Sequence, residues 1–315
     1  MSTEPYRIDV HHHILPPEYV SALASVGITS SGGRPIPNWD LQNTLAMMDR
    51  HAIATAITSI SEPGIYFGDE TFRRDLARRC NEFSAQLRHE YPQRFGAFAI
   101  LPLPEIDAAL RELEYALDTL KLDGVVLLSS VDGRYPGDPL FDELFTELNK
   151  RKAVVFLHPT VPIINSELKL DLPPFLIEFV FDTTRALTNL IYSGTLERCP
   201  EIRFIVAHAG GTVPFLAYRI SMGQIMLPGA PQGALTYLKQ LYYDTALSAM
   251  PYALRSLHEL VDASHILFAS DYPFAPEAAT FFTVQGIKNF DGFDEQARKA
   301  IARESALALF PRFSG

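Results

Sequence analysis

Cysteine is scarce in this sequence, because only Cys80 and Cys199 occur among 315 residues. Two cysteines cannot build the disulfide framework of a small secreted protein, so we expect free thiols and a cytoplasmic location. No apolar run is long enough to span a bilayer, and residues 1–5 carry no basic segment leading into an apolar stretch. We therefore expect neither a secretory signal nor a membrane partner.

Positive charge is also limited, since 27 Lys and Arg residues face 37 Asp and Glu residues and the formal net charge is −10. This balance argues against a nucleic-acid partner but leaves room for a local basic pocket that binds a small anion. Hydrophobic residues make up 47% and charged residues 20%, which excludes a disordered chain. No linker rich in Pro, Gly or Ser and no internal repeat divides the sequence, so we expect a single domain over residues 1–315.

Apolar runs typical of strands alternate with amphipathic segments along the whole chain. The predicted strands are residues 8–11, 54–59, 95–100, 124–128, 154–158, 203–208, 241–245 and 266–270. Helical spacing of apolar residues is clearest at 41–51, 70–91, 105–120 and 140–150. Eight such repeats predict a (β/α)8 TIM barrel with its active site at the C-terminal ends of the strands. A doubly wound open sheet is the alternative, but no Gly-rich phosphate loop follows the first strand.

Three consecutive histidines lie at the end of the first predicted strand. Side chains alternate along a strand, so His11 and His13 share one face and His12 points to the other. The run is too short for a purification tag and lies inside a strand pattern. Two imidazoles on one face at this spacing can grip a metal ion.

Three further polar residues follow predicted strands in the same way, namely His158, His208 and Asp271. One histidine at a strand end is more often a hydrogen-bonded structural residue than a ligand. Their coincidence with the paired histidines indicates a metal site at the active face of the barrel. Imidazole and carboxylate ligands favour Zn2+, with Mn2+, Fe2+ or Co2+ as alternatives, and an open position would make the metal catalytic.

Four motifs carry a resemblance to a known family. Residues 9–13 (DVHHH), 157–159 (LHP), 207–211 (AHAGG) and 269–273 (ASDYP) together resemble the amidohydrolase superfamily. The pattern is most similar to its 2-amino-3-carboxymuconate-6-semialdehyde decarboxylase-like branch, and residues 181–185 (FDTTR) look most like 6-methylsalicylate decarboxylases. The resemblance implies that His11, His13, His158 and Asp271 bind one divalent metal, with His208 beside it as proton shuttle or substrate contact.

The same resemblance implies a non-oxidative decarboxylase of a hydroxylated aromatic acid, in which the ring carbon is protonated before CO2 leaves. Asp271 is the expected acid, and His208 is the alternative donor or the group that resupplies the proton. The resemblance to the superfamily also implies that a binuclear centre would need a bridging carboxylated lysine at the end of the fourth strand. The predicted strand 124–128 is followed by two serines and no lysine, which disfavours such a centre. The main alternative is a mononuclear hydrolase of a lactone, ester or amide, in which Asp271 takes a proton from water. A non-catalytic barrel that binds a partner would hold no stoichiometric metal.

An anionic substrate needs a cation. Arg34, in the long loop 29–37, occupies about the place of the family's carboxylate-binding arginine, although it can also be a solvated loop residue. Arg219 matches an arginine that relatives offer across a dimer interface, so we expect a homodimer; a helix-surface ion pair is the alternative. Trp39 and Tyr272 are the expected aromatic wall of the pocket, and Arg185 can pair with Asp182 at a helical spacing.

Overall fold

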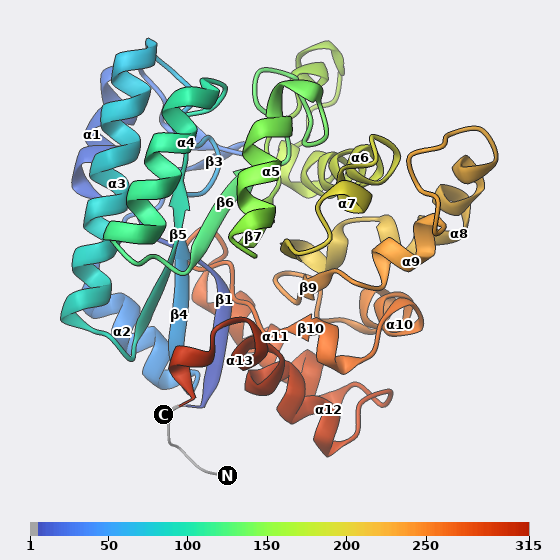
Figure 1. Cartoon of the computed structure of the whole chain (residues 1–315). Helices are drawn as coiled ribbons and strands as arrows, with labels where there is room; N and C mark the ends of the chain where they lie inside the picture. The colour runs from blue at the N-terminus through green and yellow to red at the C-terminus, as the bar shows by residue number, and fades with distance from the viewer. Residues whose placement is uncertain (1–5, 315) are drawn as a thin grey trace.

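Eight parallel strands form the centre of the molecule, which confirms the predicted (β/α)8 barrel (Figure 1). The computed structural model describes residues 6–314, so residues 1–5, where we expect no secretory signal, lie outside the described residues. Neighbouring strands follow one another in chain order. They are β1 Arg7–His13, β4 Ile53–Ser59, β5 Phe95–Ile100, β6 Gly124–Leu128, β7 Val154–His158, β8 Arg203–Val206, β9 Tyr242–Asp244 and β10 Ile266–Leu267.

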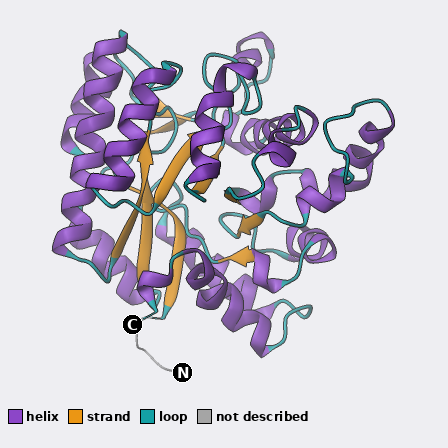
Figure 2. Ribbon diagram, in the orientation of Figure 1, coloured by secondary structure: helices purple, strands orange, loops and turns teal. Residues whose placement is uncertain are grey.

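Helices surround these strands, as Figure 2 shows. The α-helices are α1 Pro17–Ser25, α2 Leu41–Arg50, α3 Glu70–Glu90, α4 Ile106–Glu114, α5 Asp142–Lys150, α6 Glu178–Tyr192, α7 Thr195–Arg198, α8 Val213–Ser221, α9 Ala234–Leu238, α10 Pro251–Leu260, α11 Glu277–Asn289, α12 Glu295–Lys299 and α13 Ser305–Leu309. Asp69 caps α3 by accepting a hydrogen bond from the Phe72 N–H, a common start signal for a helix. None of the helices within residues 6–314 is long and apolar enough to cross a membrane.

The strands are apolar because both of their faces are covered. Every residue of β5 and β6 is buried, as expected for strands between a barrel interior and an outer ring of helices. Inside the barrel, the Phe98 and Phe156 rings stack with centroids 5.4 Å apart, and the His11 ring lies 4.8 Å from that of Phe156. A packed aromatic floor therefore lies directly below the first histidine of the site.

The barrel closes between β1 and the segment that follows β10. The ladder of β10 is only two residues long, but the chain beyond it continues to hydrogen-bond to β1. The Val10 N–H donates to the Phe268 carbonyl at 3.1 Å, and the Asp271 N–H donates to the His11 carbonyl at 2.8 Å. The residues that close the barrel are thus the same residues that bring Asp271 next to His11.

Two loops lie together over the C-terminal ends of the strands. The first contains a short hairpin, β2 Ser30–Ser31 and β3 Arg34–Pro35, and the second contains the 3-10 turn η4 Pro174–Leu176. The Phe175 N–H donates to the Gly32 carbonyl at 3.0 Å and joins the two loops. The hairpin lies within the long loop 29–37 noted in the sequence, and loops of this length in a compact domain are usually functional.

Candidate metal centre

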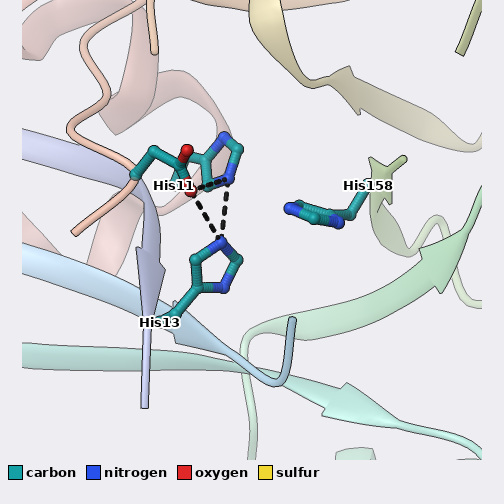
Figure 3. A group of neighbouring side chains, drawn as sticks. His11, His13 and His158 are labelled. Carbon is teal, nitrogen blue, oxygen red and sulfur yellow. Dashed lines mark hydrogen bonds and ion pairs between the residues drawn. The ribbon is translucent and has the colours of Figure 1, made fainter. Parts of the chain in front are cut away.

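Three imidazoles and one carboxylate meet at the C-terminal end of the barrel. His11 and His13 come from β1, His158 ends β7, and Asp271 follows β10; one ligand atom from each lies within 4.8 Å of the others. The Asp271 Oδ1 atom is 3.1 Å from the Nε2 atoms of both His11 and His13. Figure 3 shows the His11 and His13 rings next to each other and the His158 ring facing them.

The outer nitrogens of these histidines are already hydrogen-bonded. The Nδ1 partners are the Asp244 carboxylate at 2.7 Å from His11, the Ser59 hydroxyl at 3.0 Å from His13 and the Pro159 carbonyl at 2.7 Å from His158. These bonds leave the three Nε2 atoms to face one another and the carboxylate. Such a convergence of acceptors suits a divalent cation, and outer partners of this kind commonly orient metal-binding histidines.

Burial and charge distribute protons unevenly within the cluster. Burial disfavours a charged imidazole, yet the Asp244 and Asp271 carboxylates raise the pKa of His11 to about 10. Burial lowers the pKa of His13 to about 4, and burial together with the neighbouring imidazoles lowers the pKa of His158 well below its usual value. His13 and His158 are therefore neutral, the form that binds metals, and a dication would displace the additional proton that makes the His11 imidazole cationic.

The AHAGG motif turns His208 back over this cluster. Four successive residues from His208 to Gly211 have positive φ values between 54° and 76°. Glycine is required at the end of this turn, because a Cβ on Gly211 would lie 2.2 Å from the Val180 carbonyl oxygen. The Asp244 carboxylate accepts a hydrogen bond from the His208 N–H at 2.9 Å and anchors the turn. His208 Nε2 then lies 3.6 Å from Asp271 Oδ2, whereas His11 and His13 contact the other carboxylate oxygen, Oδ1.

A cavity of about 280 Å³ opens above the cluster. His158, His208 and Asp271 form its polar base, and Arg34 lies in its wall. The Arg34 guanidinium is 5.3 Å from the centroid of the Phe175 ring. Most of the remaining wall is apolar and includes Phe175, Leu176, Phe179, Val180, Leu247 and Phe274. The cavity thus combines a polar base, apolar sides and the exposed side chain of Arg34, a combination that suits a small anionic aromatic ligand.

The other predicted substrate residues lie elsewhere. Trp39 packs edge-on against Phe83 with ring centroids 5.8 Å apart, and Tyr272 lies beside His12 at 5.4 Å. Neither belongs to the residues that line the cavity. Arg219 lies exposed on α8 and also does not line it. The structure therefore brings together the four candidate ligands, His208 and Arg34, but not Trp39, Tyr272 or Arg219.

Two buried carboxylates organise the site and were not singled out from the sequence. Asp244 ends β9 and holds both His11 and the His208 turn. Asp9 accepts hydrogen bonds from His12 Nδ1 at 3.0 Å and from the Ser270 N–H at 3.0 Å, which ties β1 to the segment carrying Asp271. Asp244 could have been predicted as a site residue, because it is one more polar residue near the end of a predicted strand.

Comparison with known proteins places the chain in a family. The amidohydrolase family profile matches residues 8–312, and the chain belongs to this family. It is 38% identical to a protein of Aspergillus niger named decarboxylase yanB, over 98% of this chain and 88% of that protein. It is 36% identical to the 6-methylsalicylic acid decarboxylase of Penicillium expansum, over 98% and 97% of the two chains.

A solved structure supports the same assignment. The crystal structure of a protein described as amidohydrolase II superimposes with a TM-score of 0.93 at 30% sequence identity. The match covers 97% of this chain and 99% of that chain. The chain therefore shares its fold with this solved structure over nearly the whole length of both chains.

Proposed function

We propose that this protein is a metal-dependent, non-oxidative decarboxylase of a hydroxylated aromatic carboxylic acid, with 6-methylsalicylate as the first substrate to test. The observation that carries the proposal is the cavity in which His158, His208 and Asp271 form the base while Arg34 and phenylalanines form the sides. The similarity to proteins named decarboxylases supports a carboxy-lyase of this class.

The size and lining of the cavity favour a small, flat acid. Its volume of about 280 Å³ lies just below the usual range for ligand pockets, which begins at about 300 Å³, and this small size suits a single substituted ring. Phe175, Phe179 and Phe274 would contact the ring and exclude water, while the planar Arg34 guanidinium suits a carboxylate. Phe175 also lies beside Arg34, so the two side chains would meet the ring and its charged substituent together.

The two oxygens of Asp271 suggest how a proton reaches the ring. Oδ1 faces His11 and His13, whereas Oδ2 faces His208 at 3.6 Å. We assign Oδ1 to the metal and Oδ2 to the proton that is delivered to the ring carbon bearing the carboxylate. The C–C bond to CO2 then breaks, and its electron pair restores the aromatic ring. His208, which is buried at the cavity base, would return a proton to Oδ2 for the next turnover.

A divalent metal fits the four-residue cluster, and we propose Zn2+ as the resident ion with Mn2+ as its competitor. Imidazole nitrogens and carboxylate oxygens are both ligand types that zinc uses, and the four residues offer three of the first and one of the second. When bound, the cation would hold the substrate's hydroxyl and carboxylate oxygens and offset their charge. Metal analysis of the purified protein, followed by reconstitution with each ion, distinguishes the two.

We also propose that the protein is a homodimer. Large apolar side chains are exposed on α8, on the turn that follows it and on α10, and we call these residues the α8 patch. They are Phe215 at 83%, Tyr218 at 77%, Ile225 at 81%, Met226 at 80% and Tyr252 at 95% exposure. A second copy on this patch would cover it and would bury Arg219, which lies beside Tyr218. The two buried, free cysteines fit the cytoplasmic location that we propose.

The decisive experiment follows the products of 6-methylsalicylate. Loss of CO2 with proton transfer to the vacated carbon yields 3-methylphenol, and in D2O the product should carry deuterium at that carbon. We expect equimolar CO2 and 3-methylphenol from metal-loaded enzyme and none after chelation. The hydrolase alternative predicts instead that a lactone or ester is opened while 6-methylsalicylate and related hydroxybenzoates remain unchanged. That pattern of products would overturn the decarboxylase.

A further inference from the structure

Ser129, the first residue after β6, hydrogen-bonds to the backbone on both sides of Pro159. It is completely buried, and its N–H donates to the His158 carbonyl at 2.7 Å. Its hydroxyl oxygen accepts a hydrogen bond from the Thr160 N–H at 3.0 Å. Pro159 has no N–H of its own, so these two bonds fix the backbone that immediately follows the His158 ring.

The Ser129 hydroxyl hydrogen is in turn given to Asp182. This carboxylate has no solvent exposure and accepts from the Ser129 and Ser130 hydroxyls and, at 2.6 Å, from the Tyr135 hydroxyl. The Arg185 guanidinium lies 3.9 Å away, at the spacing expected from the sequence. Asp182 is therefore a buried carboxylate whose two oxygens both accept hydrogen bonds from neighbouring hydroxyls.

Asp182 also lies on the helix that forms the cavity wall. Phe179 and Val180 of α6 line the cavity, and Asp182 follows them on the same helix. The Phe179 ring lies 6.3 Å from the His158 ring. One carboxylate consequently connects the segment that carries a metal ligand to the helix that carries apolar wall residues.

We propose that Asp182, acting through Ser129, is a positioning residue that sets the place of His158 in the metal centre and aligns α6 with it. This inference rests on the proposed metal site. Asp182 touches neither the cluster nor the substrate cavity, so its effect passes through the backbone of residues 158–160. The FDTTR motif thereby acquires a physical role, because its aspartate lies at the point where helix and ligand segment are joined.

The test compares metal affinity with intrinsic stability in Ser129→Ala, Asp182→Ala and Tyr135→Phe. Zn2+ affinity is measured by competition with a chelating dye, and the thermal midpoint is measured for the metal-free and the Zn2+-loaded protein. We expect Ser129→Ala and Asp182→Ala to weaken Zn2+ binding by about 10- to 100-fold, the usual cost of removing an outer partner of a metal ligand. Tyr135→Phe removes a hydrogen bond from the far side of Asp182 and should bind Zn2+ as the wild type does.

A role through Ser129 makes two further demands on the data. The rise in thermal midpoint on adding Zn2+ should be smaller in Ser129→Ala and Asp182→Ala than in the wild type. The double variant should bind Zn2+ no more weakly than the single variant with the lower Zn2+ affinity. Equal Zn2+ affinity in wild type and Ser129→Ala, with only a lower metal-free midpoint, would overturn the inference and leave a purely structural network. Ser129→Ala decides the matter if Asp182→Ala does not fold. Failure of the wild type to bind one equivalent of either Zn2+ or Mn2+ would instead overturn the proposed metal site itself.

Discussion

At the scale of single residues, Asp271 has two environments. Burial alone would raise its pKa, but the adjacent His11, His13 and His208 imidazoles outweigh burial and hold the pKa of Asp271 well below its usual value. Its backbone has a positive φ of 59°, and its N–H is bonded to the His11 carbonyl. Asp271 is therefore ionised before the substrate binds, so the proton that it is proposed to deliver must first reach Oδ2 from His208, once the negative charge of the substrate lies beside it.

This arrangement predicts the behaviour of Asp271→Asn. The amide can still offer an oxygen to the metal, but it cannot carry a transferable proton. We expect the variant to keep much of its metal and to lose at least about two orders of magnitude in kcat, the usual size of a general-acid contribution. Metal content and turnover of 6-methylsalicylate are measured on the same preparation. Near-normal turnover with a full complement of metal would exclude Asp271 as the proton donor and leave that role to His208.

Glu62 predicts a pH dependence of stability. Burial raises the pKa of Glu62 despite hydrogen bonds from Ser31 and the Gly32 N–H. The folded protein therefore holds this proton more tightly than the unfolded chain, so its contribution to stability is complete below the unfolded pKa and is lost as pH rises through the folded pKa. Glu62→Gln has no such proton. Relative to this variant, the wild type should become less stable between acidic and neutral pH, as measured by denaturant unfolding. A difference that does not change with pH would contradict the prediction.

The candidate ligands were predictable because each follows an apolar strand, and a parallel barrel gathers strand ends at one face. Whether Trp39 and Tyr272 face the pocket could not be derived from the sequence, because a loop position does not determine where a side chain points. Trp39 turns toward Phe83, and the Tyr272 ring lies beside His12 on the other face of β1. The apolar wall at Phe175 and Phe179 also depends on long-range packing, for which the sequence carries no local periodicity.

At the scale of elements, the β2–β3 hairpin presents Arg34 to the cavity. Its turn packs closely on the second loop, because a Cβ on Gly33 would lie 2.8 Å from Pro174 Cδ and 3.0 Å from Pro173 Cα. Gly33 also has a φ of +84°. The hairpin can therefore approach this loop only with glycine at the turn.

Gly33→Ala should push the hairpin outward and displace Arg34. We expect KM for the aromatic acid to rise about tenfold, equivalent to about 1.4 kcal/mol of binding, with a smaller change in kcat. Gly27→Ala is the matched control, since Gly27 has a similar φ of +74° but nothing within 4 Å of its Cβ position. Steady-state kinetics of both variants separates backbone strain from the clash. A similar KM in the two variants would show that the clash does not reach Arg34.

All eight predicted strands are present, and their differences from prediction have local causes. The run 203–208 ends at Val206 as a strand because positive φ values begin at His208. The run 266–270 gives only a two-residue ladder, since the chain beyond β10 bonds to β1 instead. The predicted helix 105–120 is α4 followed by a π-helical turn at Tyr115–Thr119, a widening that apolar spacing does not reveal.

At the scale of the whole molecule, the α8 patch carries the prediction of a dimer. Leu247, half exposed, lines the cavity and precedes α10, so a partner on the patch would approach the cavity rim. We expect Tyr218→Asp to weaken self-association by at least about 30-fold, because a buried interface aromatic commonly contributes 2 kcal/mol or more. Sedimentation velocity measures the change. Leu140→Asp, an exposed apolar position outside the patch, should leave association unchanged, and equal effects of the two substitutions would argue against this interface.

The seam between β1 and the chain after β10 has a consequence for the metal-free protein. Phe268, Asp271 and Tyr272 complete the ring of backbone bonds while Asp271 completes the ligand set. Because Asp271 takes part in both, we expect binding of the ion to stabilise the closure of the barrel at this edge. In the metal-free protein this edge should therefore open more readily than it does in the metal-loaded protein.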